Sequence, residues 1–341
     1  MNQDSLDPIE TEEALVERMT RPSEEVREAL RQLNGPVLIL GAGGKMGPSL
    51  AELLVRGGAP GVIAVSRFSR PGERRYLEGI GVETISADLL DEDALAALPE
   101  APSVFLLVGY KFGATGNEGA TWATNAWLPG QVVRRYSRSR IVYLSSGNVY
   151  AFAPASGKGS AEEGELGPVG EYAWSRLGGE RVAAFWSARL GTPLAIARLF
   201  YATELRYGII HDIAWKVWRR EPIDLRTGNV NQIWQGDANA YLARLLPLCS
   251  SPPSVVNITG PQVLPVRRIA LDLGRELGVE PLFAGAEEES ALLGDASELV
   301  ARLGPPAVSP RRIIRWMARW VRAGGRSLGK PTGYESRQGR F

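Results

Sequence analysis

The feature that most constrains the fold is a short apolar run, PVLIL at residues 36–40, which leads directly into the glycine-rich segment GAGGKMG at residues 41–47. Such a run is typical of a strand buried in a parallel sheet. Glycines at this junction permit a tight turn, let the main chain approach a pyrophosphate, and let the next helix pack closely on the strand. The N-terminus of that helix offers N–H groups to phosphates. We therefore predict a dinucleotide-binding loop formed by Gly41, Gly44, Lys45, Met46 and Gly47.

Short apolar runs continue to alternate with helical stretches as far as residue 200. Further strands are predicted at residues 61–66, 82–86, 103–108, 140–145 and 193–199. The longest helical stretch, EYAWSRLGGERVAAFWSARLG, closes at Gly191, a residue type that commonly ends helices. Buried strands that alternate with helices predict an α/β fold with a doubly wound parallel sheet, the Rossmann fold.

The sequence pattern changes on both sides of this alternating region. The segments TEEALVERM and SEEVREALRQL precede it with apolar residues at helical spacing, and Ser23 makes a suitable helix start. Amphipathic helical patterns predominate after residue 200, and the last residues are polar and rich in glycine. We predict a helical extension (1–34), a nucleotide-binding domain (35–200, with 230–260 returning to it), a mostly helical cap (201–229 and 261–323) and an irregular tail (324–341).

Composition excludes several kinds of chemistry. Cys249 is the only cysteine and His211 the only histidine, so a Cys/His zinc site, a Cys–His nucleophile pair and an internal disulfide are impossible. Lys plus Arg number 39 against 38 for Asp plus Glu, which favours neither nucleic acid nor an anionic membrane as a partner. No apolar leader segment and no membrane-spanning run is visible. We expect a soluble, cytoplasmic protein without a metal, whose partner is a small-molecule substrate.

The end of the second predicted strand bears on the choice between NAD and NADP. An acidic residue there would bind the ribose 2′-hydroxyl and repel a 2′-phosphate. This chain has Ser66 and Arg67 instead, followed by Arg70, and a hydroxyl with a guanidinium suits a 2′-phosphate. We predict NADP, with NAD as the alternative; the other interpretation is a solvated basic loop. Asp88, followed by Leu89, is placed to contact the adenine amino group, or else to cap a helix.

Four segments, in order, carry a resemblance to a known family: GAGGKMG, Asp88, LSSGNVY at residues 144–150 and EYAWSRLGGE at residues 171–180. The chain resembles the extended short-chain dehydrogenases/reductases, in the NAD(P)-dependent epimerase/dehydratase family that includes the nucleotide-sugar 4-epimerases. The family reads S-S-x-x-V-Y and Y-x-x-x-K at the last two segments. The resemblance covers roughly residues 35 to 322.

The resemblance implies roles for individual side chains. Tyr172 matches the tyrosine that donates or removes the proton of a substrate hydroxyl or carbonyl, while the nicotinamide carries the hydride. Ser146 matches the serine that hydrogen-bonds the same oxygen. Asn125 matches an asparagine that supports a proton-relay water, and Lys111 a lysine that contacts the cofactor. Val108 and Gly109 join the predicted cofactor contacts in the same loop as Lys111.

Arg176 departs from the family pattern, because it occupies the lysine position of Y-x-x-x-K. Tyr172 and Arg176 are four residues apart and share one helix face. A phenol with a pKa near 10 needs a nearby cation to act as a base at neutral pH. Arginine supplies that charge, but it cannot lose a proton and so cannot relay one. Either the enzyme works with arginine, or the protein binds the cofactor as a regulator without turnover.

A second departure concerns the substrate. Nucleotide-sugar epimerases carry an arginine that grips the diphosphate, and Val230 stands at that position here. This favours a small polyol or sugar-like substrate over a nucleotide sugar, which remains the alternative. The expected activity is NAD(P)-linked oxidation, reduction or epimerisation at a carbon bearing a hydroxyl or carbonyl. The candidate substrate contacts are Phe112, Asn148, Tyr201, Tyr207, His211 and Trp234.

The sequence also predicts a homodimer. Residues 125–136 and 173–186 match the helices that pair as a four-helix bundle in the resembling family. The second carries more apolar residues than one buried stripe requires, and exposed apolar surface usually marks an interface. The alternative is that the N-terminal extension, residues 1–34, covers these helices instead.

Overall fold

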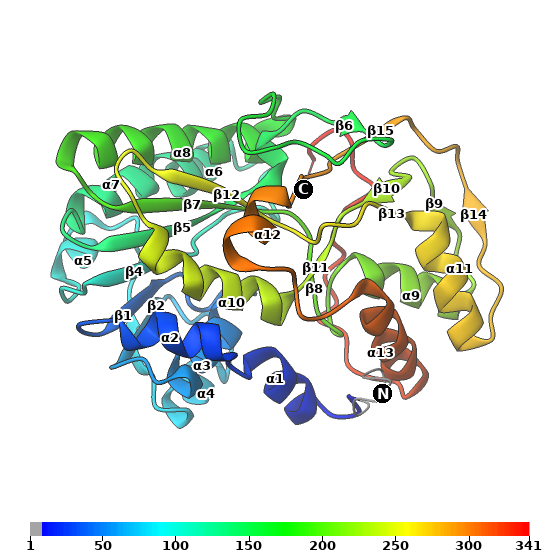
Figure 1. The fold of residues 1–341 in the computed structure, drawn as a ribbon, viewed down its shortest axis with the longest axis horizontal. Helices are drawn as coiled ribbons and strands as arrows, with labels where there is room; N and C mark the ends of the chain where they lie inside the picture. The colour runs from blue at the N-terminus through cyan, green and yellow to red at the C-terminus, as the bar shows by residue number, and fades with distance from the viewer. Residues whose placement is uncertain (1–8, 341) are drawn as a thin grey trace.

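The computed structural model describes residues 9–340, and at its centre lies a seven-stranded sheet in which all neighbouring strands are parallel (Figure 1). The strand order is β12-β7-β5-β4-β1-β2-β3. The order reverses between β1 and β4, and ligands of such sheets bind at the carboxyl ends of the strands where this happens. The predicted fold class, a doubly wound parallel sheet, is confirmed. The strands are β1 (Val37–Leu40), β2 (Val62–Ser66), β3 (Glu83–Ser86), β4 (Ser103–Leu106), β5 (Arg140–Ser146), β7 (Leu194–Leu199) and β12 (Ser254–Ile258).

Helices cover both faces of the sheet, which explains why β1 is apolar at every position. Val37 and Ile39 pack into the core on one face, whereas Leu38 and Leu40 pack into the core on the other. The first face is covered by α3 (Gly47–Gly57), α4 (Glu73–Gly79), α10 (Gln235–Leu245) and α12 (Ser297–Leu303). The second is covered by α5 (Glu92–Ala97), α6 (Glu118–Trp122), the π-helical turn η1 (Ala123–Trp127), α7 (Leu128–Arg135) and α8 (Gly170–Leu190).

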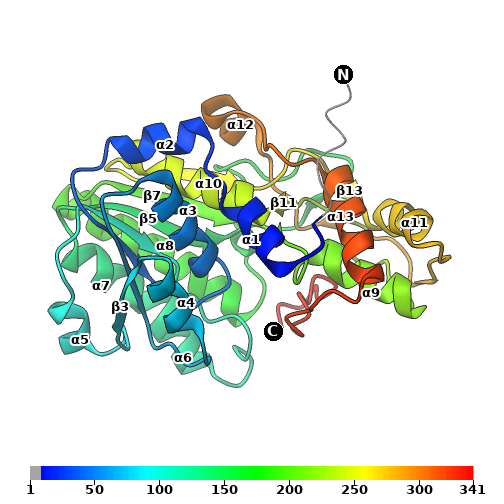
Figure 2. The same cartoon turned by 90° about the horizontal axis from the view of Figure 1, so that it is seen from below.

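The N-terminal extension forms α1 (Glu12–Thr20) and α2 (Glu24–Arg31), and Ser23 caps α2 by accepting a hydrogen bond from Val26 N. α2 packs on α3 and α10, on the face of the sheet opposite α7 and α8 (Figure 2). The alternative in which this extension covers α7 and α8 is therefore wrong for the described residues; residues 1–8 of the predicted extension lie outside them. α1 instead joins the core of the cap through Leu15 and Met19.

A second core holds the cap together, built by α9 (Ile209–Arg219), α11 (Val266–Leu277) and α13 (Pro310–Arg322). Ser309 caps α13 by accepting from Arg312 N. Residues 235–258 return to the first core through α10 and β12. The remaining elements are short: β6 (Ala153–Pro154), β8 (Ala202–Thr203), β9 (Ile223–Asp224), β10 (Asn229–Val230), β11 (Ile233–Trp234), β13 (Leu264–Pro265), β14 (Phe283–Ala284), β15 (Ser290–Ala291) and the 3₁₀ turns η2 (Gly147–Val149) and η3 (Leu246–Leu248).

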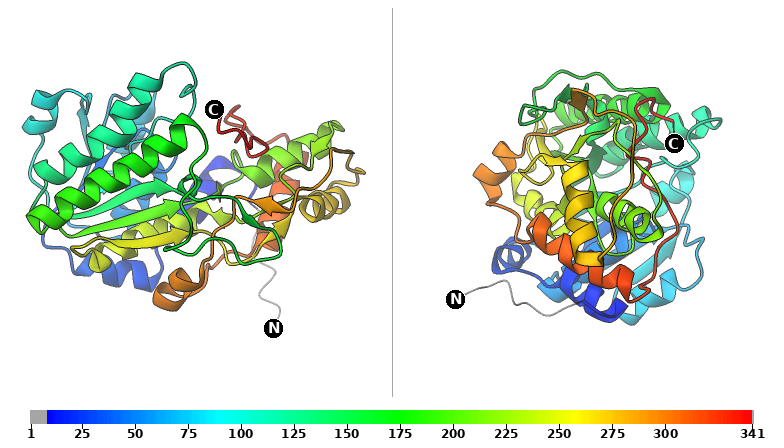
Figure 3. Two further views of the ribbon diagram at one scale, coloured as in Figure 1. Left: turned by 90° about the horizontal axis from the view of Figure 1, so that it is seen from above. Right: turned by 90° about the vertical axis from the view of Figure 1, so that its right-hand side faces the viewer.

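The C-terminal segment, residues 324–340, is irregular but packed against the molecule. It runs between the nucleotide-binding half and the cap (Figure 3, left). Thr332 donates from N and from Oγ1 to Asp212 Oδ2, at 2.8 and 2.6 Å, and Tyr334 is buried in the core of the cap. Lys216 Nζ lies 2.5 Å from Glu335 Oε1. These contacts hold the segment along α9.

Across residues 9–340, no helix has both the length and the apolar character needed to cross a membrane. The same residues contain no cluster of three or more His, Cys, Asp and Glu side chains suited to a metal ion.

Candidate active site

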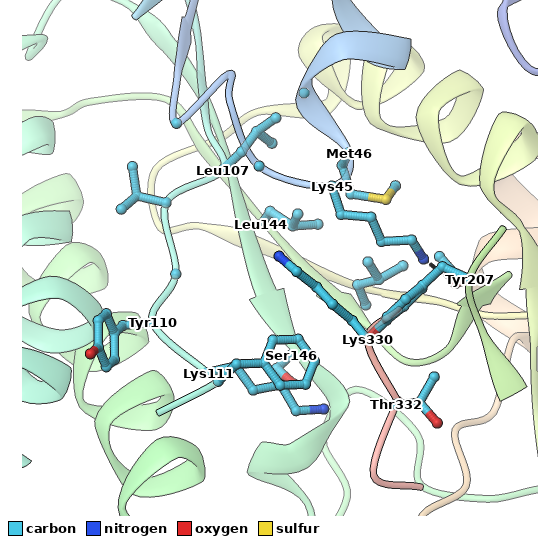
Figure 4. A pocket seen from close by; sticks show the side chains of 18 of the residues that line it. Lys45, Met46, Leu107, Tyr110, Lys111, Leu144, Ser146, Tyr207, Lys330 and Thr332 are labelled. Atoms are coloured by element: carbon cyan, nitrogen blue, oxygen red, sulfur yellow. Dashed lines mark hydrogen bonds between the residues drawn. The ribbon is translucent and has the colours of Figure 1, made fainter. Parts of the chain in front are cut away.

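A cavity of about 610 Å³ lies at the carboxyl ends of β1, β4 and β5, where the strand order of the sheet reverses. Its walls come from the glycine loop, the loops after β2 and β4, the end of β5, the first turns of α8 and α9, and the C-terminal segment (Figure 4). β4 ends at Leu106, two residues before the predicted end of that strand, so that residues 107–112 leave the sheet and line the cavity.

The glycine loop has a main-chain path that other residues cannot follow. Gly41 has φ +89°, and a Cβ there would lie 2.9 Å from Val108 N. A Cβ on Gly47 would lie 2.1 Å from Ala42 O, inside any van der Waals contact. Within the described residues, Met46 makes no side-chain cap at the start of α3, so the first N–H groups of this helix are open to a ligand. This cradle fits a dinucleotide pyrophosphate.

Two arginines that follow β2 line the cavity. Three other residues predicted to contact the cofactor, Ser66, Asp88 and Leu89, do not line it. Arg67 and Arg70 are both in the wall, and Arg70 Nη2 donates to Gly43 O. Ser66 Oγ accepts from Phe68 N at 3.4 Å instead of facing the cavity. Asp88 Oδ1 accepts from Leu90 N at 3.0 Å and its Oδ2 lies 3.9 Å from Arg67. Asp88 does not cap a helix, because Asp91 is the residue that caps α5. Leu89 is buried in the core.

Tyr172 and Ser146 line the same cavity as the glycine loop. Ser146 ends β5, and its Oγ donates to Asn148 Oδ1 at 3.0 Å and accepts from Asn148 N at 3.2 Å. Tyr172 lies in the first turn of α8 and is 9% exposed. The end of β5 and the start of α8 thus bring the Ser146 hydroxyl and the Tyr172 phenol to one wall of the cavity. Of the predicted substrate contacts, the cavity is lined by Phe112, Asn148, Tyr201 and Tyr207.

Arg176 also lines the cavity, although it is only 3% exposed, and main-chain carbonyls hold it. Its Nη1 donates to Val108 O at 2.9 Å and its Nη2 donates to Leu144 O. Its Nε is buried without a hydrogen-bond partner among the described residues. The guanidinium therefore joins the ends of β4 and β5, and its Cζ lies 5.0 Å from the ring centroid of Tyr143.

Two lysines approach the cavity as partly desolvated cations. Lys111 Nζ lies 5.7 Å from the ring centroid of Tyr172, and burial lowers the pKa of Lys111 to about 8. Lys45 Nζ donates to Ala202 O and lies 4.2 Å from the Tyr207 ring centroid. Burial lowers the pKa of Lys45 to about 7, although the charge of Glu204 acts in the opposite direction. Val108 and Gly109, ahead of Lys111 in the same loop, also line the cavity.

Asn125 lies in the π-helical turn η1, buried and outside the cavity lining. Its Oδ1 accepts from Tyr110 N at 2.8 Å, and its Nδ2 donates to Tyr110 O and Ser175 Oγ, each at 3.0 Å. The side chain therefore ties the loop after β4 to α8. These contacts join the loop that carries Lys111 to the helix that carries Tyr172. The support of a relay water by Asn125 stays a prediction.

His211 and Trp234 do not line the cavity, contrary to the prediction. His211 lies 5% exposed on the buried side of α9, with Nδ1 3.1 Å from Asp212 Oδ1. Trp234 is 1% exposed and packs against Trp316 in the cap core. Sequence reasoning also missed contributors from the C-terminal segment, which offers no periodicity that could have marked them. These lining residues are Leu328, Lys330 and Thr332.

A parallel sheet with a glycine loop where its strand order reverses, next to a tyrosine and a serine, defines the dinucleotide-binding α/β enzymes. Residues 37–203 match the model of the NAD dependent epimerase/dehydratase family. This part of the chain, which holds the glycine loop, Ser146 and Tyr172, therefore matches the NAD-dependent epimerase/dehydratase family. No curated protein matches the chain.

Solved structures share the fold at low sequence identity. A putative epimerase from Burkholderia cenocepacia J2315 is 20% identical, with a TM-score of 0.71 over 86% of this chain and 99% of its own. The UDP-glucuronic acid 4-epimerase from Bacillus cereus, in complex with NAD, is 17% identical with a TM-score of 0.68 over 84% of this chain and 98% of its own. The dTDP-glucose 4,6-dehydratase DesIV from Streptomyces venezuelae, with NAD and TYD bound, is 18% identical with a TM-score of 0.71 over 84% and 97%.

Proposed function

We propose that this protein is an NADP(H)-dependent oxidoreductase or epimerase that acts at a hydroxyl- or carbonyl-bearing carbon of a small polyol or sugar-like substrate. The observation that carries the proposal is one shared cavity: Tyr172 and Ser146 line the same walls as the glycine loop, and the Lys111 ammonium lies 5.7 Å from the Tyr172 ring centroid. A bound nicotinamide would supply the hydride donor or acceptor at this site.

Tyr172 moves the proton in this mechanism. In the oxidative direction its phenolate takes the proton of the substrate hydroxyl, and in the reductive direction the phenol returns a proton to the carbonyl oxygen. Ser146 holds the same oxygen by a hydrogen bond. A phenolate needs a nearby cation, because the ordinary pKa of tyrosine is near 10.

Two cations divide the task that one lysine performs in the family motif. Arg176 provides a fixed charge, since its Nη groups are already bound to Val108 O and Leu144 O. Lys111 provides a charge that can also lose its proton, since burial lowers its pKa to about 8. We assign the proton-exchanging role to Lys111. The retained pair of Tyr172 and Ser146 favours an enzyme over a cofactor-binding regulator, which needs neither hydroxyl.

The preference for NADP rests on Arg67 and Arg70, which line the cavity at the end of β2, where an acidic side chain would favour NAD. The preference for a small substrate rests on Val230, which is completely buried in the cap core. An arginine that binds a diphosphate would not fit at this position in the cap core. The nucleotide sugars named for the similar solved structures remain the second candidate class, because those proteins share the fold over 84% of this chain.

The test of this function follows the absorbance of reduced nicotinamide over a panel of polyols, sugars and nucleotide sugars. Tyr172→Phe should lower turnover by about a thousandfold, and should leave the dissociation constant for NADP within about twofold because the phenol acts on the substrate. The control is Tyr110→Phe, the same chemical change at a lining residue that the mechanism does not use. Full turnover by Tyr172→Phe would exclude this mechanism, and NADP binding without turnover on any substrate would favour a regulator.

We also propose a homodimer that pairs through α8 and its neighbours. Trp174, Val182 and Phe185 are 51, 37 and 57% exposed, and separations of eight and three residues put them on one stripe of α8. Trp122 and Trp127, on α6 and η1, are exposed too. Light scattering after size exclusion should show a dimer for the wild type and a monomer for Phe185→Glu. A monomeric wild type at micromolar concentration would overturn the proposal.

A further inference from the structure

Lysine is scarce in this chain, yet it gathers in the cavity. The sequence has five lysines among 39 basic residues, and three of them line the cavity. Lys45 comes from the glycine loop, Lys111 from the loop after β4, and Lys330 from the C-terminal segment. Figure 4 shows all three side chains at one pocket, with Lys45 extending toward Tyr207. Segments far apart in the sequence thus deliver the same kind of charge to one place.

All charged side chains of the cavity wall are positively charged. Besides the three lysines it contains Arg67, Arg70 and Arg176, and the described residues contribute no Asp or Glu to it. Burial lowers the pKa of Lys45 and of Lys111 because it removes their ammonium groups from water. Such a wall favours ligands that carry negative charge.

The cofactor accounts for only part of this charge. Its phosphates would lie along the glycine loop and the end of β2, near Lys45, Arg67 and Arg70. Lys330 enters from the opposite side, on the segment that runs along α9. It makes no hydrogen bond or ion pair with the other described residues. Its charge is therefore available to a different group.

The C-terminal segment is anchored on both sides of Lys330. Leu328 N donates to Arg206 O at 3.0 Å, and Thr332 donates twice to Asp212 Oδ2 in the first turn of α9. Only one residue separates Lys330 from each anchor, so its backbone is held at the mouth of the cavity. This segment is consequently a wall of the site, although its sequence has the composition of a tail.

We propose that the substrate carries an anionic oxygen group, a carboxylate or a phosphate, which Lys330 and Lys111 bind beside Tyr172. This inference rests on the proposed function, because Tyr172 marks the place of the reacting carbon. Val230, which stands where the nucleotide-sugar epimerases carry an arginine that binds the diphosphate, is uncharged and buried in the cap core. The anion therefore belongs to the reacting part of the substrate, and residues 324–340 belong to the substrate site.

The experiment measures binding by calorimetry, to protein saturated with NADP and to protein without it. The probes are glucuronate and glucose 6-phosphate, each compared with glucose. We expect one charged probe to bind at least about tenfold more tightly than glucose, because one hydrogen bond to a charged group contributes about that much to affinity. Lys330→Gln should remove most of that preference, and Lys330→Arg should restore it in part. Lys158→Gln, at an exposed lysine outside the cavity, is the matched control.

The outcomes separate the two chemistries and the two proposals. Tighter binding of glucuronate assigns a carboxylate, and tighter binding of glucose 6-phosphate assigns a phosphate. Failure of both charged probes to bind better than glucose overturns the inference, as does a preference that survives Lys330→Gln. Neither result bears on NADP binding or on Tyr172→Phe. If the protein did not bind NADP, or if Tyr172→Phe kept full turnover, the proposed function would be refuted. The titration of the protein without NADP would still test Lys330.

Discussion

The two ends of the cavity are built by different means. At the cofactor end the wall is main chain: Gly41 and Gly47 leave no space for a Cβ, and the start of α3 presents its N–H groups. At the substrate end the wall is side chains, brought by the loop after β4, the end of β5, the start of α8 and the C-terminal segment. A main-chain site should tolerate almost no substitution, whereas a side-chain site should lose function one group at a time.

The sharpest way to break this comparison is to add one methyl group to the cofactor end. Gly47→Ala would put a Cβ 2.1 Å from Ala42 O, and the loop would have to move. We expect a loss of about 3 kcal/mol in the free energy of unfolding and a fall of at least about a hundredfold in NADP affinity. Gly79→Ala is the control, because a Cβ there meets none of the described residues within 4 Å. Wild-type NADP affinity in Gly47→Ala would show that the main chain does not hold the pyrophosphate.

A smaller effect is expected from a side chain at the cofactor end. Arg67→Gln should weaken NADP binding by about tenfold, the contribution of one charge-assisted contact to the 2′-phosphate. The dissociation constant for NAD, measured by the same titration, should stay within about twofold. Arg75→Gln, at an exposed arginine outside the cavity wall, should change neither affinity. Equal losses for NAD and NADP would mean that Arg67 does not distinguish the two cofactors.

The smallest effect concerns Lys45, where the two ends meet. Burial lowers its pKa to about 7 from an ordinary value of 10.5. Between these two values the unfolded chain keeps the proton and the folded protein has lost it, so the free energy of unfolding should rise with pH across this window. Below about pH 7 both states are protonated, and the full destabilisation by the buried charge is present.

Lys45→Met should therefore raise the melting temperature more at about pH 6 than at about pH 10, and flatten the pH dependence between them. Thermal unfolding at a series of pH values measures this, with Lys158→Met at an exposed lysine as the control. An unchanged pH dependence would place the ammonium of Lys45 in solvent and remove it from the cavity wall.

Local patterns predicted much of the architecture. The sequence predicted the glycine loop and six strands of the sheet, which are β1, β2, β3, β4, β5 and β7. It also predicted the Ser23 cap and the helix end at Gly191. Each of these features depends on contacts within a few residues. Tyr172 and Ser146 were predicted from the resemblance of two sequence segments to the family motifs, and both line the cavity.

Long-range packing decided the rest. His211 and Trp234 have the chemistry of ligand contacts, but the cap core buries them away from the cavity, and no local pattern separates an aromatic that faces a ligand from one that faces a core. Arg176 has its Nη groups on two carbonyls that lie 68 and 32 residues away in the chain. Lys330 belongs to the site only because Asp212 and Arg206 hold its segment in place. The sequence by itself determined the elements and the cofactor loop, because periodicity and turn chemistry act between near neighbours. The tertiary structure alone decided which charged side chains meet at the substrate end, because those side chains come from segments that only the packed cap brings together.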